Sequence, residues 1–169
     1  MAKIVVNDKP LKLAVSACLL GELVRYDGGH RRHPFVAEVL ADLFDLVAVC
    51  PEVGVGMGVP RPMIQLVDQG SGLRVLRVGD PQCDETERLR RYSARMAVEL
   101  GQVSGYVLKS RSPSCGLRAP VVPRGVSPGL FAGEIARAWP QLPMVEDDAL
   151  ADEVAQQRFI EQVVAYGQR

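Results

Sequence analysis

The sequence has no net charge, few aromatic residues and no long apolar segment. Its 20 basic and 20 acidic residues cancel, and aromatic residues make up 5% of the chain. Because neither a basic excess nor a stacking motif is present, we expect no nucleic-acid duplex and no anionic membrane as partner. No apolar run reaches the roughly 18 residues of a membrane-spanning helix. A small or single-stranded ligand is compatible with this composition.

Two further absences limit redox and nucleotide chemistry. No pair of cysteines forms the C-x-x-C motif of thiol–disulfide enzymes, and neither the dinucleotide-binding nor the P-loop glycine motif occurs. The first ten residues lack the apolar core and cleavage site of a signal peptide, so we expect a cytoplasmic protein. In that compartment the four cysteines are expected to be reduced, metal-bound or catalytic rather than disulfide-paired.

Short apolar runs alternate with amphipathic segments along the 169 residues. We predict a single domain over residues 1–169, of α/β class, with a mostly parallel central sheet flanked by helices in a Rossmann-like arrangement. Strands are expected at residues 11–17, 44–49, 105–108 and 142–146. Helices are expected at residues 34–42, 83–100, 127–139 and 148–166. A β-hairpin appended to the sheet is predicted at residues 63–67 and 73–78, and irregular structure at residues 51–62 and 116–126.

Three of the cysteines occupy the same kind of position. Cys18 and Cys50 directly follow the first two predicted strands, and Cys115 follows the third, within the segment Lys109 to Gly116. Since the carboxyl ends of parallel strands face one ligand crevice, these strands would bring three thiols to one place. Cys83 lies outside this pattern, and we expect it to have no role in the site.

The number of thiols limits the kinds of site that they can form. A structural zinc site normally has four protein ligands, whereas a catalytic metal keeps one coordination position open. An iron–sulfur cluster on three thiolates would likewise leave one iron free as a Lewis acid. Thiolates suit iron–sulfur clusters, zinc or Cu(I). The cysteines could also be no more than buried core residues, although strand ends rich in Ser, Pro and charged residues favour a functional site.

Polar residues near the three cysteines are candidates for the chemistry. Glu52 lies two residues after Cys50 and could act as an acid or base, and Ser112 lies three residues before Cys115 and could position water. We place six more residues around a substrate or cluster, namely Ser16, Arg25, Arg61, Lys109, Ser110 and Ser114. His30 and His33 are expected in a surface loop, because no third ligand is nearby in the sequence.

Five motifs occur together in one order, and they resemble a family that includes the bacterial thiouracil desulfurases. They are Ser16 to Gly21, Arg25 to Gly29, Cys50-Pro51-Glu52, Pro60-Arg61-Pro62 and Lys109 to Gly116. The resemblance extends from about residue 11 to the predicted terminal helix. The stretches Val53 to Val59 and Met63 to Val67 depart from the family pattern. The departing loop would line the substrate pocket, so the natural substrate is left open.

The resemblance implies a [4Fe-4S] cluster on Cys18, Cys50 and Cys115, with Glu52 and Ser112 as the catalytic pair. The implied reaction exchanges the thiocarbonyl sulfur of a thiolated pyrimidine, as free base or nucleotide, for oxygen. Hydrosulfide is released and no net redox change occurs. The cluster is expected to be lost or replaced by another metal during aerobic purification.

Other functions are compatible with the same residues. Zinc on the three cysteines, with Glu52 as the base, would make the protein a hydrolase. A cluster without catalysis would make it a sensor or an RNA-binding module, although the neutral charge and few aromatic residues weigh against RNA.

Overall fold

A four-stranded parallel sheet forms the centre of the computed structural model, which describes residues 2–169. Its strand order is β11-β8-β3-β4, with β3 at Lys12–Ser16, β4 at Asp45–Val49, β8 at Val103–Leu108 and β11 at Met144–Glu146. Ser16 pairs with Val49, Val15 with Val107, and Glu146 with Leu108, so the four strands end nearly level. The predicted Rossmann-like α/β fold is confirmed.

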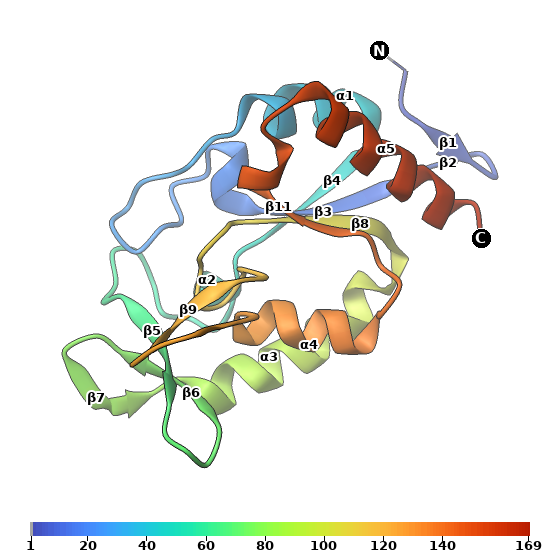
Figure 1. Cartoon of the computed structure of the whole chain (residues 1–169). Helices are drawn as coiled ribbons and strands as arrows, with labels where there is room; N and C mark the ends of the chain where they lie inside the picture. Colours follow the sequence, from blue (N-terminus) through green and yellow to red (C-terminus); the bar gives the residue numbers. More distant parts are fainter. Residues whose placement is uncertain (1) are drawn as a thin grey trace.

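Helices cover both faces of this sheet (Figure 1). A π-helical turn at Phe35–Leu40, the short helix α1 at Ala41–Leu43 and the terminal helix α5 at Glu153–Gly167 lie on one face. The helices α3 at Thr86–Glu99 and α4 at Leu130–Ala138 lie on the other. The strands supply side chains to both layers because successive residues point to opposite faces.

The two layers have separate cores. In β3, Leu13 and Val15 pack with Phe159 of α5, whereas Ala14 packs with Tyr106 and Phe131 on the opposite face. All six side chains have at most 3% of their surface exposed. Burial of apolar surface on both faces fixes the position of the sheet, and with it the position of the strand ends.

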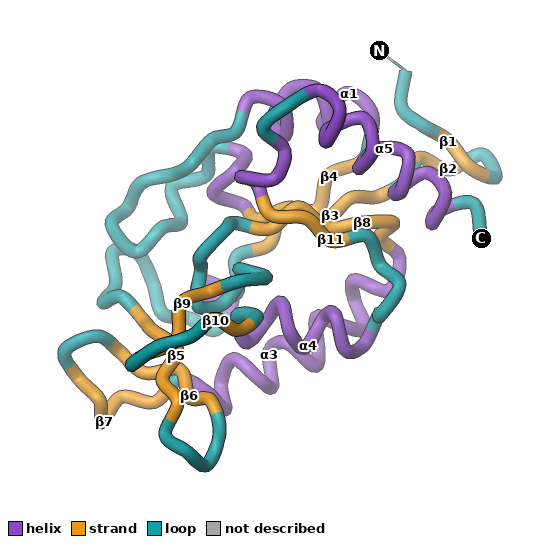
Figure 2. Tube along the Cα trace, viewed as in Figure 1, coloured by secondary structure: helices purple, strands orange, loops and turns teal. Residues whose placement is uncertain are grey.

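The predicted hairpin belongs to a second, five-stranded sheet with the order β10-β9-β5-β6-β7. The hairpin itself is confirmed as β5 at Ile64–Asp68 and β6 at Leu73–Arg77. The other strands are β7 at Asp80–Asp84, β9 at Ala119–Val122 and β10 at Val126–Ser127. Figure 2 shows this sheet beside the loops at the carboxyl ends of β3, β4 and β8.

Two predictions about irregular structure were wrong. Residues 119–122 form β9, because Ala119 and Val121 are buried while Pro120 and Val122 face outward. Residues 51–54 form the short helix α2, Pro51–Gly54, which starts with proline at its first position after an extended Cys50. The amide of Gly54 donates to the carbonyl of Cys50 at 2.8 Å, which closes this turn.

Three predicted helices begin later than expected. The helix expected at residues 127–139 is α4, which starts at Leu130, because Val126 and Ser127 pair with β9 as strand β10. Residues 80–84 are paired with β6, so α3 starts at Thr86. Residues 147–150 form a 3₁₀ turn, and α5 starts after Asp152, whose carboxylate accepts a hydrogen bond from the Ala155 amide. Further short elements are β1 at Val5–Val6, β2 at Lys9–Pro10 and 3₁₀ turns at Ala17–Leu20 and Leu100–Gln102. Within residues 2–169, no helix has the length and apolarity needed to cross a membrane.

Candidate active site

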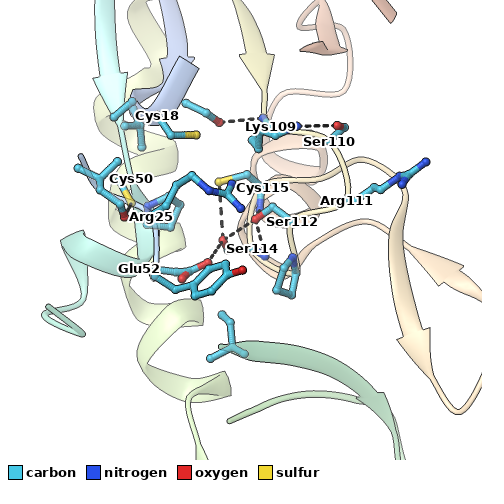
Figure 3. Close-up of a pocket in the computed structure, with 18 of the residues that line it drawn as sticks. Cys18, Arg25, Cys50, Glu52, Lys109, Ser110, Arg111, Ser112, Ser114 and Cys115 are labelled. Carbon is cyan, nitrogen blue, oxygen red and sulfur yellow. Dashed lines mark hydrogen bonds between the residues drawn. The ribbon is translucent and has the colours of Figure 1, made fainter. Parts of the chain in front are cut away.

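Three thiols meet at the carboxyl end of the parallel sheet. Cys18 lies in the 3₁₀ turn after β3, Cys50 directly follows β4, and Cys115 lies on the loop after β8. All three line one cavity of about 550 Å³ (Figure 3) and none is in a disulfide. Cys18 and Cys115 are buried and Cys50 is half-buried. The fold thus assembles residues separated by 32 and 65 positions.

Every catalytic, metal-binding or environment residue that the sequence analysis named singly lines this cavity. The expectation that residues 53–59 line the pocket was wrong, because none of them is among the lining residues. Besides the cysteines, the lining includes Glu52 and the serine and basic residues named above, together with Tyr26 and Asp147, which were not predicted. His30, His33 and Cys83 are not among the lining residues. Cys83 lies on β7, in the second sheet.

Burial keeps the three thiols protonated in the absence of a ligand. It raises the pKa of Cys18, against the opposing effect of the Arg25 charge, and it raises the pKa of Cys50. For Cys115 burial and the neighbouring Cys50 together raise the pKa far above that of an exposed thiol. Since a metal binds the thiolate form, loading this site releases protons.

The donor set suits a metal–sulfur group better than a single ion. Thiolates around one zinc ion lie about 4 Å apart, and within residues 2–169 no three His, Cys, Asp or Glu side chains are grouped closely enough to hold one ion. The Nε of Arg25 is buried without a hydrogen-bond partner, and the nearest carboxylate oxygen, on Asp27, is 4.0 Å away. An unpaired buried donor costs about 1–3 kcal/mol. An anionic group bound between the thiols would give it an acceptor.

Arg61 holds Glu52 in a fixed orientation beside Cys50. Its Nε donates to Glu52 Oε2 at 2.7 Å, and its two Nη atoms donate to the carbonyls of Gly58 and Val24 at 2.9 and 2.8 Å. Only 4% of the Arg61 side chain and 12% of the Glu52 side chain are exposed. The ion pair therefore occupies one carboxylate oxygen and leaves Oε1 free for other partners.

The second carboxylate oxygen of Glu52, Oε1, accepts a hydrogen bond from Ser114. Ser114 Oγ donates to Glu52 Oε1 at 2.9 Å, and Ser112 Oγ lies 3.1 Å from Ser114 Oγ. The Cys115 amide donates to Ser112 Oγ at 3.0 Å. The two predicted catalytic residues, Glu52 and Ser112, therefore share the site, with Ser114 between them (Figure 3).

The loop that carries these serines is seated on the first turn of α4. The amides of Leu130 and Ala132 donate to the carbonyls of Pro113 and Ser114 at 3.1 and 3.0 Å. This close contact requires glycine at position 129, since a Cβ there would lie 2.6 Å from the carbonyl carbon and oxygen of Ser114. The helix end thus supplies donors that fix the path of the loop.

Asp147 organises the opposite side of the cavity. Its carboxylate accepts hydrogen bonds from Lys109 Nζ at 2.8 Å and from the Ser110 amide at 2.7 Å. Burial alone would raise the pKa of Asp147, but these hydrogen bonds hold it below the ordinary range. Ser16 Oγ accepts from the Lys109 amide at 3.0 Å. Asp147 directly follows β11, so the strand-end argument that selected the cysteines would also have found it.

Comparisons with known proteins agree with this arrangement. The family model described as 2-thiouracil desulfurase matches residues 13–147. No curated protein sequence matches the chain. A solved structure of a [4Fe-4S]-dependent thiouracil desulfidase is similar to it, with a TM-score of 0.62 and 27% sequence identity, over 83% of this chain and 93% of that chain. This chain therefore belongs to the 2-thiouracil desulfurase family.

Proposed function

We propose that this protein is a thiouracil desulfidase that binds a [4Fe-4S] cluster through Cys18, Cys50 and Cys115. The main support for this proposal is that the three strand-end thiols and the Glu52–Ser114–Ser112 hydrogen-bond chain line the same cavity. Family membership and the similarity to a [4Fe-4S]-dependent desulfidase support it. The reaction would replace the thiocarbonyl sulfur of a thiolated pyrimidine by oxygen, without net redox change.

Three protein thiolates would leave one iron of such a cluster without a protein ligand, and this iron would supply Lewis-acid chemistry toward a sulfur atom. Arg25 and Lys109 line the same cavity, and their positive charges would offset the negative charge of the cluster. The raised pKa of each thiol means that binding the cluster releases protons.

The protein's own polar residues would manage the protons of the exchange. Glu52 has the position of a general acid and base, because it lies in the first turn of α2, two residues after Cys50. Arg61 orients it, and the Cys115 amide holds Ser112. In this arrangement Glu52 would take a proton from the attacking oxygen and return a proton to the departing sulfur.

The charges around the cavity also bear on the substrate. Arg25 and Arg111 line it, and arginine is well suited to phosphate because its planar guanidinium donates two parallel hydrogen bonds. Arg111 is exposed, at a backbone φ of 59°. A thiouridine nucleotide is therefore a candidate substrate beside the free thiouracil base.

The test is sulfide release by protein reconstituted with iron and sulfide under anaerobic conditions. The substrates are 2-thiouracil, 4-thiouracil and the corresponding nucleotides, and the matching oxo pyrimidine should form in equal amount. We expect catalytic turnover of at least one of them. Well-folded, iron-loaded protein that releases no sulfide from any of these compounds would contradict the proposal.

A further inference from the structure

The hydrogen bonds around Glu52 define a directed path for a proton. Ser112 Oγ accepts from the amides of Cys115 and Ser114, at 3.0 and 3.3 Å. The Cys115 amide occupies one lone pair of Ser112 Oγ, and the Ser114 amide approaches the other only at 3.3 Å, so this second lone pair is left to accept from a water. Ser114 has one hydroxyl proton and gives it to Glu52 Oε1, so in the 3.1 Å contact between the two serines the proton comes from Ser112. Ser112 is therefore the donor in its contact with Ser114.

The direction of the next bond is fixed by the carboxylate. An ionised carboxylate only accepts, so Ser114 must donate its single proton to Glu52 Oε1 at 2.9 Å. The competing acceptor, Cys115 Sγ, is 3.7 Å from Ser114 Oγ and is the weaker partner. Arg61 occupies the other oxygen, Oε2, at 2.7 Å. The path thus ends at one defined atom.

Burial makes Ser114 a required member of this path. Ser114 is 1% exposed, and it lies between Glu52 and Ser112. Its backbone is anchored separately, because its carbonyl accepts from the Ala132 amide at 3.0 Å. The hydroxyl itself makes no contribution to that anchor, and apart from the 3.7 Å approach to Cys115 Sγ its contacts are those of the proton path.

We propose that Ser114 relays a proton between the oxygen held at Ser112 and Glu52, a role that rests on the proposed function. As a water at Ser112 attacks the pyrimidine carbon, an O–C bond forms and one water O–H bond breaks. That proton passes to Ser112 Oγ, the Ser112 proton to Ser114 Oγ, and the Ser114 proton to Glu52 Oε1. Both serines end neutral and Glu52 ends protonated, so one proton has moved in total. Glu52 then gives this proton to the sulfur, and the C–S bond breaks with its electron pair leaving on hydrosulfide. The second water proton is released to solvent as the C=O bond of the product forms.

The test compares Ser114→Ala and Ser114→Thr with the wild type as reconstituted holoenzymes. Removing a positioned proton-transfer group costs about 10²-fold or more in rate. We expect Ser114→Ala to lower kcat by about that factor, with KM, iron content and visible absorption unchanged. Ser114→Thr keeps the hydroxyl and is expected to recover most of the lost activity. Ser71→Ala, in the exposed turn between β5 and β6, serves as the matched control.

Two further readouts test the relay: a solvent isotope effect, which a structural serine would not produce, and a double-mutant cycle, which reports the Ser114–Glu52 hydrogen bond on which the relay depends. The solvent deuterium isotope effect on kcat of the wild type should show that more than one proton moves in the same step. In a double-mutant cycle on the thermal midpoint of the holoenzyme, Glu52→Gln should cause a smaller shift in the Ser114→Ala background than in the wild type. Unchanged kcat in Ser114→Ala, loss of iron in that variant, or additive midpoint shifts would overturn the proposal. Failure of the proposed function would differ, because the wild type itself would release no sulfide.

Discussion

At the scale of single residues, Arg61 and Glu52 form an ion pair that differs from the surface pairs of this chain by its burial. The Arg61–Glu52 pair has exposed side-chain fractions of 4% and 12%, whereas Arg90–Glu87 has 46% and 61%. Breaking a buried pair leaves a charge without compensation, which water cannot screen. The position of the Glu52 carboxylate is therefore coupled to the stability of the fold.

Replacing Arg61 by glutamine should destabilise the protein and misplace Glu52. We expect Arg61→Gln to lower the free energy of unfolding by about 3 kcal/mol, measured by urea denaturation. Arg90→Gln, which breaks a pair of nearly the same length, should change it by less than about 1 kcal/mol. Equal effects of the two variants would show that burial does not set the strength of the Arg61–Glu52 pair.

At the scale of elements, a second buried carboxylate ties α3 to the second sheet. Glu85 is 1% exposed and binds Arg77 of β6 and Arg88 of α3 at 2.7 and 2.8 Å. Arg88 in turn donates to the carbonyl of Val55, just after α2. Burial would raise the pKa of Glu85, but the hydrogen bond from Arg77 and the two arginine charges hold it below the ordinary value of 4.5.

This lowered pKa predicts how stability depends on pH. A carboxyl with a lower pKa in the folded state contributes stability above its ordinary pKa, and this contribution is lost as the pH falls through the lower folded-state pKa. Glu85→Gln should therefore cost about 2 kcal/mol near pH 7, and the difference from the wild type should shrink as the pH falls below about 4.5. Urea unfolding at several pH values measures both. A difference that stays constant with pH would contradict the assignment.

The loop that carries Cys115 depends on its fit against α4. Gly129 has a φ of −56°, which any residue adopts, so its requirement is steric and arises from the 2.6 Å approach to Ser114. We expect Gly129→Ala to displace the loop and to reduce iron loading and the thermal midpoint. Gly133→Ala, in the same helix, meets nothing closer than 3.5 Å and should leave both unchanged. Full iron loading in Gly129→Ala would show that the loop tolerates a shifted helix.

At the scale of the whole molecule, the sequence predicts the central sheet and the convergence of its strand ends better than the second sheet. The strands that precede Cys18 and Cys50 are apolar runs bounded by turn-forming residues, so periodicity and composition identify them. Strand β9 contains Pro120 and lies between prolines and glycines, and its pairing with β5 and β10 makes it a strand. Such pairing is non-local and leaves no local signal in the sequence.

In the site, too, the sequence predicts the residues that lie near a cysteine in the chain, but not those whose place depends on the three-dimensional fold. Glu52 and Ser112 could be selected because each lies within three residues of a cysteine. The place of Ser114 between them could not, because it depends on how the loop after β8 meets α2 in three dimensions. Likewise, the contact of Arg61 with Glu52 depends on the path of the loop through residues 55–60, which no periodicity specifies.

The central claim is that three distant thiols hold one cluster, and iron content tests it most directly. The wild type, Cys83→Ser and Cys115→Ser are reconstituted anaerobically with iron and sulfide, and bound iron is measured per folded chain. We predict about four irons for the wild type and for Cys83→Ser, and loss of the cluster in Cys115→Ser. Folded wild-type protein that binds no iron, or Cys115→Ser protein that binds as much as the wild type, would contradict the account.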